Sequence, residues 1–288
     1  MRIILNRINI FLVILYIVVV LPLWAGLLRD SHFSFPGLHG INPAIAAERQ
    51  KIRQQSKIKV LNLLMPSGYA DLVDLSRSRR DPESVDLDKY IGYYAQAAAV
   101  LPVPFSADAH AMLGFCYYHE GKIKESYESY LRALEENPAF IWTYNNLALL
   151  QFKQGDYPKA AALLEQGLKS DPQTSVKVLA SSKIYADIMR DAKDGVDLPA
   201  ELKSAYSDAA RMLVISLYRM GKFPETISAA QYAVTSGFEP AAVFYYYAGA
   251  ALEASGDHLK AQEFLKAVGP GHEHEDVFTG QDLAARIF

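Results

Sequence analysis

The chain has 288 residues, of which 51% are hydrophobic and 21% are charged, and its formal net charge is −3. This composition excludes an intrinsically disordered chain. The mildly acidic balance argues against a nucleic-acid-binding protein, which would present a basic surface. The single cysteine, Cys116, excludes an intramolecular disulfide, and we interpret it as a small buried apolar residue.

Residues 8–28 form an uncharged run rich in Ile, Leu and Val. A helix needs about 20 residues to cross a bilayer core about 30 Å thick, so this run predicts a transmembrane helix. A cleaved signal peptide and a buried core helix are the alternatives. A signal peptide would have a shorter apolar region followed directly by small residues, whereas Leu27, Leu28 and Arg29 follow here. We therefore expect residues 1–29 to be a cytoplasmic stub and an uncleaved anchor.

The charges around the anchor predict its orientation. Arg2 and Arg7 precede the run, and the Arg29 charge that follows it is offset by Asp30. The positive-inside rule then places the N-terminus in the cytoplasm and the remaining chain outside it, in the periplasm. The basic stretch at 49–59 supports the opposite topology, because it could hold the chain against anionic lipid on the cytoplasmic side.

Residues 30–69 are expected to be a stalk between the anchor and the folded part of the chain. The stretch 29–43 contains the Ser, Gly and Pro residues that are typical of a linker. The stretch 44–64 has an uneven apolar side, which predicts one helix, and Pro66 and Gly68 end it.

Two tandem units with the same spacing follow the stalk. Gly121 recurs as Gly155 and Pro138 recurs as Pro172, in both cases 34 residues later. Corresponding positions hold Leu113, Gly114, Tyr117 and Ala133 in the first unit and Leu147, Ala148 and Ala160 in the second. This pattern resembles the tetratricopeptide repeat (TPR) family, whose 34-residue unit is a helix-turn-helix.

The residue types suit that architecture. Small residues such as Gly114, Ala148 and Ala160 let the two helices of a unit approach each other closely. Gly121 and Gly155 end the first helix, where a left-handed residue is needed. Proline cannot continue the second helix. The resemblance implies an all-α solenoid of TPR type, preceded here by the N-terminal transmembrane helix.

Less regular units surround the clear pair. Gly221 and Gly256 are the expected turn glycines of two further units at 207–270. Residues 70–174 are predicted to be an array with a degenerate first unit and then the two clear repeats. Residues 175–206 are either a degenerate repeat or an irregular helical insertion. Residues 271–288 are expected to be a tail or cap.

The family resemblance also implies a concave groove lined by the first helix of each unit. The predicted partner-binding residues are Tyr118, His119, Trp142, Asn145, Asn146, Phe152, Tyr218 and Tyr246, and the same register includes Asp208, Arg211 and Tyr247. Aromatic rings and amides favour an extended or helical peptide as the guest. The alternative is that these side chains pack between helices. For Phe115, Leu149 and Ile215 the two interpretations are equally open.

One TPR subtype binds a C-terminal carboxylate through Lys and Asn side chains. Asn146 matches one of those asparagines, but Ala111 stands at the lysine position and Phe115 at the second asparagine. The sequence therefore predicts no carboxylate clamp.

The sequence shows no motif of known chemistry. It contains no phosphate-binding loop, no dinucleotide fingerprint and no HExxH helix. His272 and His274 form the densest group of metal-ligand residues, and we interpret them as part of a polar tail. We therefore expect no catalytic, cofactor or metal site.

The expected function is a non-enzymatic, single-pass membrane scaffold that binds a protein or peptide in an aromatic-lined groove, in envelope biogenesis or secretion. Self-association of the repeats into a structural assembly is the alternative. A metal-binding or enzymatic role for the histidine tail is a further, weaker one. Nucleic acid is not an expected partner.

Overall fold

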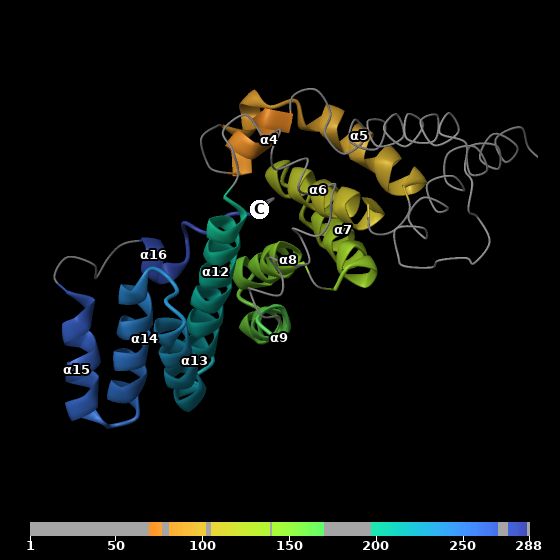
Figure 1. Ribbon diagram of the computed structural model, residues 1–288. Coiled ribbons are helices and arrows are strands. Elements are labelled where there is room, and N and C mark those ends of the chain that lie inside the picture. Colours follow the sequence, from red (N-terminus) through yellow and green to blue (C-terminus); the bar gives the residue numbers. More distant parts are fainter. Residues whose placement is uncertain are drawn as a thin grey trace, which may run out of the picture.

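The computed structural model describes residues 69–76, 81–101, 105–138, 140–169, 197–269 and 276–286. Their elements are α4 (Tyr69–Ser76), the short η2 (Pro82–Ser84), α5 (Leu87–Val100), α6 (Phe105–His119), α7 (Ile123–Glu136), α8 (Ile141–Lys153), α9 (Tyr157–Gly167), α12 (Leu198–Arg219), α13 (Phe223–Thr235), α14 (Ala241–Ala254), α15 (His258–Val268) and α16 (Asp276–Thr279). Figure 1 shows these helices as a curved array of antiparallel pairs, and the all-α prediction is confirmed for this part of the chain.

Several predicted features lie outside the described residues. They are the anchor at 8–28, the stalk up to residue 68, Pro172, and the pair His272 and His274. Among the helices that the structure does describe, none combines the length and the apolar character that crossing a bilayer requires.

The turns inside four of the described helix pairs have the same hydrogen-bonded geometry. Gly121 ends α6 with φ of 75°, and its N–H donates to the carbonyl of Tyr118 at 3.1 Å. The next N–H, of Lys122, donates to the carbonyl of Tyr117 at 2.9 Å, which completes a Schellman cap. Gly155, Gly221 and Gly256 repeat this geometry after α8, α12 and α14, with φ of 78°, 71° and 85°. These four glycines are the ones that the repeat pattern of the sequence places at the turns.

Close helix contact within a pair depends on one small residue that faces a large one. A Cβ placed on Gly114 of α6 would lie 2.6 Å from the Tyr130 ring of α7, and a Cβ on Gly249 of α14 would lie 2.7 Å from Leu265 of α15. In the register of the turn glycines, the second clear repeat has Ala148 opposite Leu164 at these positions. Reduced bulk on one helix is thus matched by greater bulk on its partner.

The helix pairs stack in chain order. α5 packs on α6, α7 on α8, α9 on α12, and α13 on α14. α12 also packs on α8, as the first helix of the next repeat would. The stretch 170–196 therefore separates two repeats that are direct neighbours in space. Residues 170–196 lie outside the described residues, and the two interpretations of 175–206, a degenerate repeat and an irregular helical insertion, stay predictions.

The structure changes the predicted boundary at 206/207, which falls inside the continuous helix α12. The Asp197 side chain accepts a hydrogen bond from the Ala200 N–H at 3.3 Å and so caps the helix ten residues earlier than the repeat signature suggests. Pro199 sits in the first turn, where a missing N–H costs nothing.

The core runs along the whole described array. Phe115, Leu149 and Ile215, for which core and groove positions were equally open, are all at most 2% exposed. Cys116 is fully buried, and burial raises the pKa of its thiol to about 12, so the thiol stays protonated. This agrees with its interpretation as a small apolar core residue.

We predict that Gly114→Ala destabilises the protein by about 1–3 kcal/mol, because the added methyl group overlaps the buried Tyr130 ring. Adding Tyr130→Leu reproduces the Ala148/Leu164 pair of the next repeat and should recover part of this loss. Thermal unfolding followed by circular dichroism measures both effects. Gly92→Ala in α5 is the control, because a Cβ there meets no atom within 4 Å and should be neutral or stabilising. Equal destabilisation by both glycine substitutions would contradict the packing argument.

Candidate functional site

The first helices of the repeats, α6, α8, α12 and α14, form one face of the array, which we call the inner face. The chain's own C-terminal segment, residues 276–286, covers this face. Figure 1 shows this segment passing from α16, beside α14, along α12 towards α8 and α6. It has one turn of helix at α16, and residues 283–286 have no regular secondary structure. The predicted tail or cap thus lies along the first helices of the repeats. Its apolar side chains are buried against these helices. A segment that covered only α15 would not bury them in this way.

Asn146 of α8 makes two hydrogen bonds to the backbone of this segment. Its side-chain N–H donates to the Arg286 carbonyl at 2.7 Å, and its carbonyl oxygen accepts from the Arg286 backbone N–H at 3.0 Å. One amide side chain therefore satisfies both backbone groups of one residue of the segment. Because these groups are common to all residues except proline, this contact selects an extended backbone and not a particular side chain.

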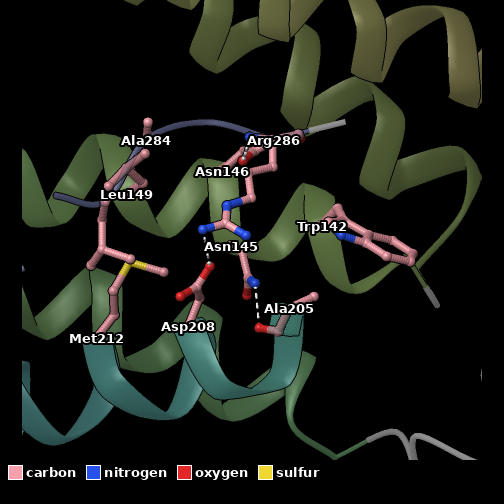
Figure 2. Close-up of a pocket in the computed structure, with 10 residues that line it drawn as sticks. Trp142, Asn145, Asn146, Leu149, Ala205, Asp208, Met212, Ala284 and Arg286 are labelled. Atoms are coloured by element: carbon pink, nitrogen blue, oxygen red, sulfur yellow. Dashed lines mark hydrogen bonds and ion pairs between the residues drawn. The ribbon is translucent and has the colours of Figure 1, made fainter. Parts of the chain in front are cut away.

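Four charged side chains form an alternating network between α12 and the segment. Arg211, which is 3% exposed, lies 2.9 Å from Asp282 and 3.6 Å from Asp208. Arg286 lies 3.4 Å from Asp208 and also donates to the Ser204 hydroxyl at 3.1 Å. In Figure 2 the Arg286 side chain points from the segment towards Asp208 on α12. Burial raises the pKa of the Asp208 carboxyl, and the two arginines oppose that shift.

Apolar contacts hold the segment between these polar ones. Phe278, Leu283 and Ala285 are at most 5% exposed. The Phe278 ring meets the Tyr246 ring edge-on at a centroid distance of 5.1 Å, and its carbonyl accepts a hydrogen bond from the Tyr247 hydroxyl. A Cβ on Gly280 would lie 3.1 Å from the Phe152 ring, so the segment turns tightly against α8 at this point.

Half of the predicted groove residues contact the C-terminal segment directly. Asn146, Phe152 and Tyr246 do so through the contacts given above. His119 interacts with the backbone of Ala285, and burial lowers the pKa of its imidazole to about 4. His119 is therefore neutral near pH 7, and its Nε2 is buried without a hydrogen-bond partner.

The other predicted groove residues lie next to these contacts. Trp142 is 3% exposed and lines the same pocket as Leu283 and Arg286. The Asn145 side chain donates to the Ala205 carbonyl at 2.7 Å, which ties α8 to α12 (Figure 2). Tyr118 is half-buried with Lys153 5.7 Å from its ring, and Tyr218 packs on Tyr247 at 5.1 Å.

Sequence reasoning missed the partners that Asp208, Arg211 and Asn146 have in the segment. Asp282 and Arg286 stand in a stretch interpreted as a tail or cap. The available signal was its apolar residues, Phe278 and Leu283 among them, which an exposed tail would not need. Within the described ranges, no group of His, Cys, Asp and Glu side chains is arranged to hold a metal ion.

Comparisons with known proteins agree with the repeat architecture. Residues 114–155 match a family described as TPR repeat, and residues 142–174 match one described as tetratricopeptide repeat. No curated protein matches the chain.

Similar solved structures share little sequence with this chain. MamA from MSR-1 is 18% identical with a TM-score of 0.39, covering 63% of this chain and 91% of its own. MamA from AMB-1 is 19% identical with a TM-score of 0.41, covering 68% and 95%. The nearly identical TPR-like repeats of a Podosopora anserina kinesin light chain are 17% identical with a TM-score of 0.42, covering 75% and 92%.

The family matches fall on the two clear repeats found in the sequence, and the described helices α12 to α15 continue the same helix-turn-helix pattern after them. Repeats of this kind bind protein partners and typically belong to non-enzymatic scaffolds. The chain therefore contains TPR repeats, which the family matches place at residues 114–174.

Proposed function

We propose that this protein is a membrane-tethered scaffold that binds an extended segment of a partner protein along the inner face of its repeats. One observation carries the proposal, namely that this face already holds a peptide segment, residues 276–286, through a backbone-directed amide, ion pairs to the buried Arg211 and apolar contacts. A face that binds one peptide of this chemistry has the means to bind another.

The contacts contribute to recognition in different ways. The Asn146 amide holds a backbone in place without regard to sequence. Arg211 and Asp208 then favour a guest with charges in the complementary order. Phe152, Tyr246 and Tyr247 supply apolar area at low entropic cost.

The tether and its direction are part of the same proposal. The uncharged run 8–28 supports an anchor, and Arg2 and Arg7 before it support a repeat domain on the periplasmic side. An anchored peptide-binding domain on that side would gather partners for envelope biogenesis or secretion.

Site-specific crosslinking tests partner binding. We expect a photoreactive phenylalanine analogue in place of Trp142, in the full chain in its native membrane, to capture a distinct protein. The same analogue at Tyr232 is the matched control, because this aromatic residue is 51% exposed on α13, away from the inner face. Capture of the same proteins at both positions, or of none at position 142, would count against the proposal.

The predicted topology is tested by labelling Tyr232→Cys in intact cells with a membrane-impermeant maleimide. The native Cys116 is fully buried and should stay unlabelled, which makes the wild-type chain its own control. We expect labelling of Cys at position 232 once the outer permeability barrier is opened, before the inner membrane is lysed. Labelling only after lysis would place the repeats in the cytoplasm.

A further inference from the structure

We propose that residues 276–286 are an intramolecular ligand of the inner face, and that a partner binds by displacing them with a segment of similar chemistry. This inference rests on the proposed function and adds to it the kind of partner and a means of regulation. The C-terminal segment would then set a threshold of affinity that any partner has to exceed in order to bind.

The segment is held by contacts that can be exchanged without opening the repeats. The contacts described above involve side chains of α6, α8, α12 and α14, while the helix pairs keep their own turns and packing. The side chains of Asp282 and Arg286 in the segment are 41% and 40% exposed. Water can therefore reach the segment's half of these ion pairs, whereas Arg211 on the repeats is buried.

Release of the segment would leave specific groups without partners on the repeats. Arg211 would lose its 2.9 Å contact with Asp282 and keep only the longer one to Asp208. Asn146 would lose both of its bonds to Arg286. Since a buried cation without its partner is costly, the open face should be refilled by a guest that offers a carboxylate at the Asp282 position.

The same contacts define which residues a displacing segment of a partner should carry. A guest would carry an acidic residue, then an aliphatic residue to fill the place of Leu283, then two small residues, and then an arginine that reaches Asp208, as in the sequence Asp282-Leu283-Ala284-Ala285-Arg286. The arginine carbonyl that accepts the Asn146 N–H belongs to a continuing chain here, and an arginine inside a partner's chain offers the same acceptor. An internal or extended segment of a partner fits this requirement.

Tethering gives the chain's own segment a large advantage. A segment joined to its binding face by a short stretch of chain has an effective concentration on the order of millimolar, so a segment that binds with a Kd of roughly 10–100 μM would weaken a competitor about 10- to 100-fold. The threshold should disappear when the segment alone is altered.

The test uses the full chain in detergent and a fluorescent peptide of residues 276–286 with an amide at its C-terminus. Leu283→Asp introduces a charge at a position that is 4% exposed, whereas Gln281→Asp introduces the same group at an exposed neighbour and is the matched control. Fluorescence anisotropy should show that the Leu283→Asp chain binds the peptide at least tenfold more tightly than the wild-type and Gln281→Asp chains. A peptide of scrambled sequence should bind none of them.

Arg286→Ala provides a milder second variant in case Leu283→Asp loses its helical circular dichroism signal. It removes the contacts to Asp208 and Ser204 without introducing a charge, and it should shift the affinity in the same direction by a smaller factor. The proposal is overturned if the folded variants bind the peptide no better than the wild type. It is also overturned if the difference vanishes on dilution of the protein, because occupation by a second copy would then explain it.

The crosslinking experiment separates this inference from the proposed function. Tighter peptide binding by Leu283→Asp, with no protein captured at position 142 by either chain, would support the intramolecular ligand and refute the partner. Equal capture of a partner by wild-type and Leu283→Asp chains would support the scaffold and refute the threshold.

Discussion

The architecture depends on a left-handed residue at the end of the first helix of each repeat. A Schellman cap at Gly121 turns the chain back within two residues, so that α7 begins at Ile123. A residue with a Cβ is strained in this conformation, and a longer turn would separate the helices. The short turn brings the two helices into close contact. Gly114 permits this approach, and the Tyr130 ring fills the space beside it. The same turn, repeated after α8, α12 and α14, gives the array its regular curvature and its inner face.

These constraints explain which parts of the structure could be predicted from the sequence. Turn glycines and small-to-large pairs are local, so Gly121 and Gly155 at a fixed spacing identify the repeats directly. The start of α12 was not predictable from that spacing, because Asp197 and Pro199 extend the helix beyond its repeat by ordinary capping chemistry. The groove positions followed from the repeat register, but that register contains no information about what covers them.

The position of residues 276–286 on the inner face was not predicted, because it depends on contacts between residues far apart in the sequence. Asn146 and Arg286 are 140 residues apart, and Arg211 and Asp282 are 71 apart. Nothing in the local pattern around Asp282 or Arg286 indicates either pair. What the sequence does contain is a conflict, since apolar residues such as Leu283 occur in a stretch with no repeat of its own. An apolar stretch without local partners predicts a distant contact, although not its position.

The inner face of the repeats is part of the core, and in the proposed function it is also the binding surface, which limits what a partner can gain by binding there. Trp142, Phe152 and Asn146 are all less than 10% exposed because the C-terminal segment and the neighbouring helices cover them. A partner therefore gains no free energy by burying surface that is already buried. It gains only the difference between its own contacts and those of residues 276–286. Selectivity is set by that difference, and the segment that completes the fold also determines which partners can compete for it.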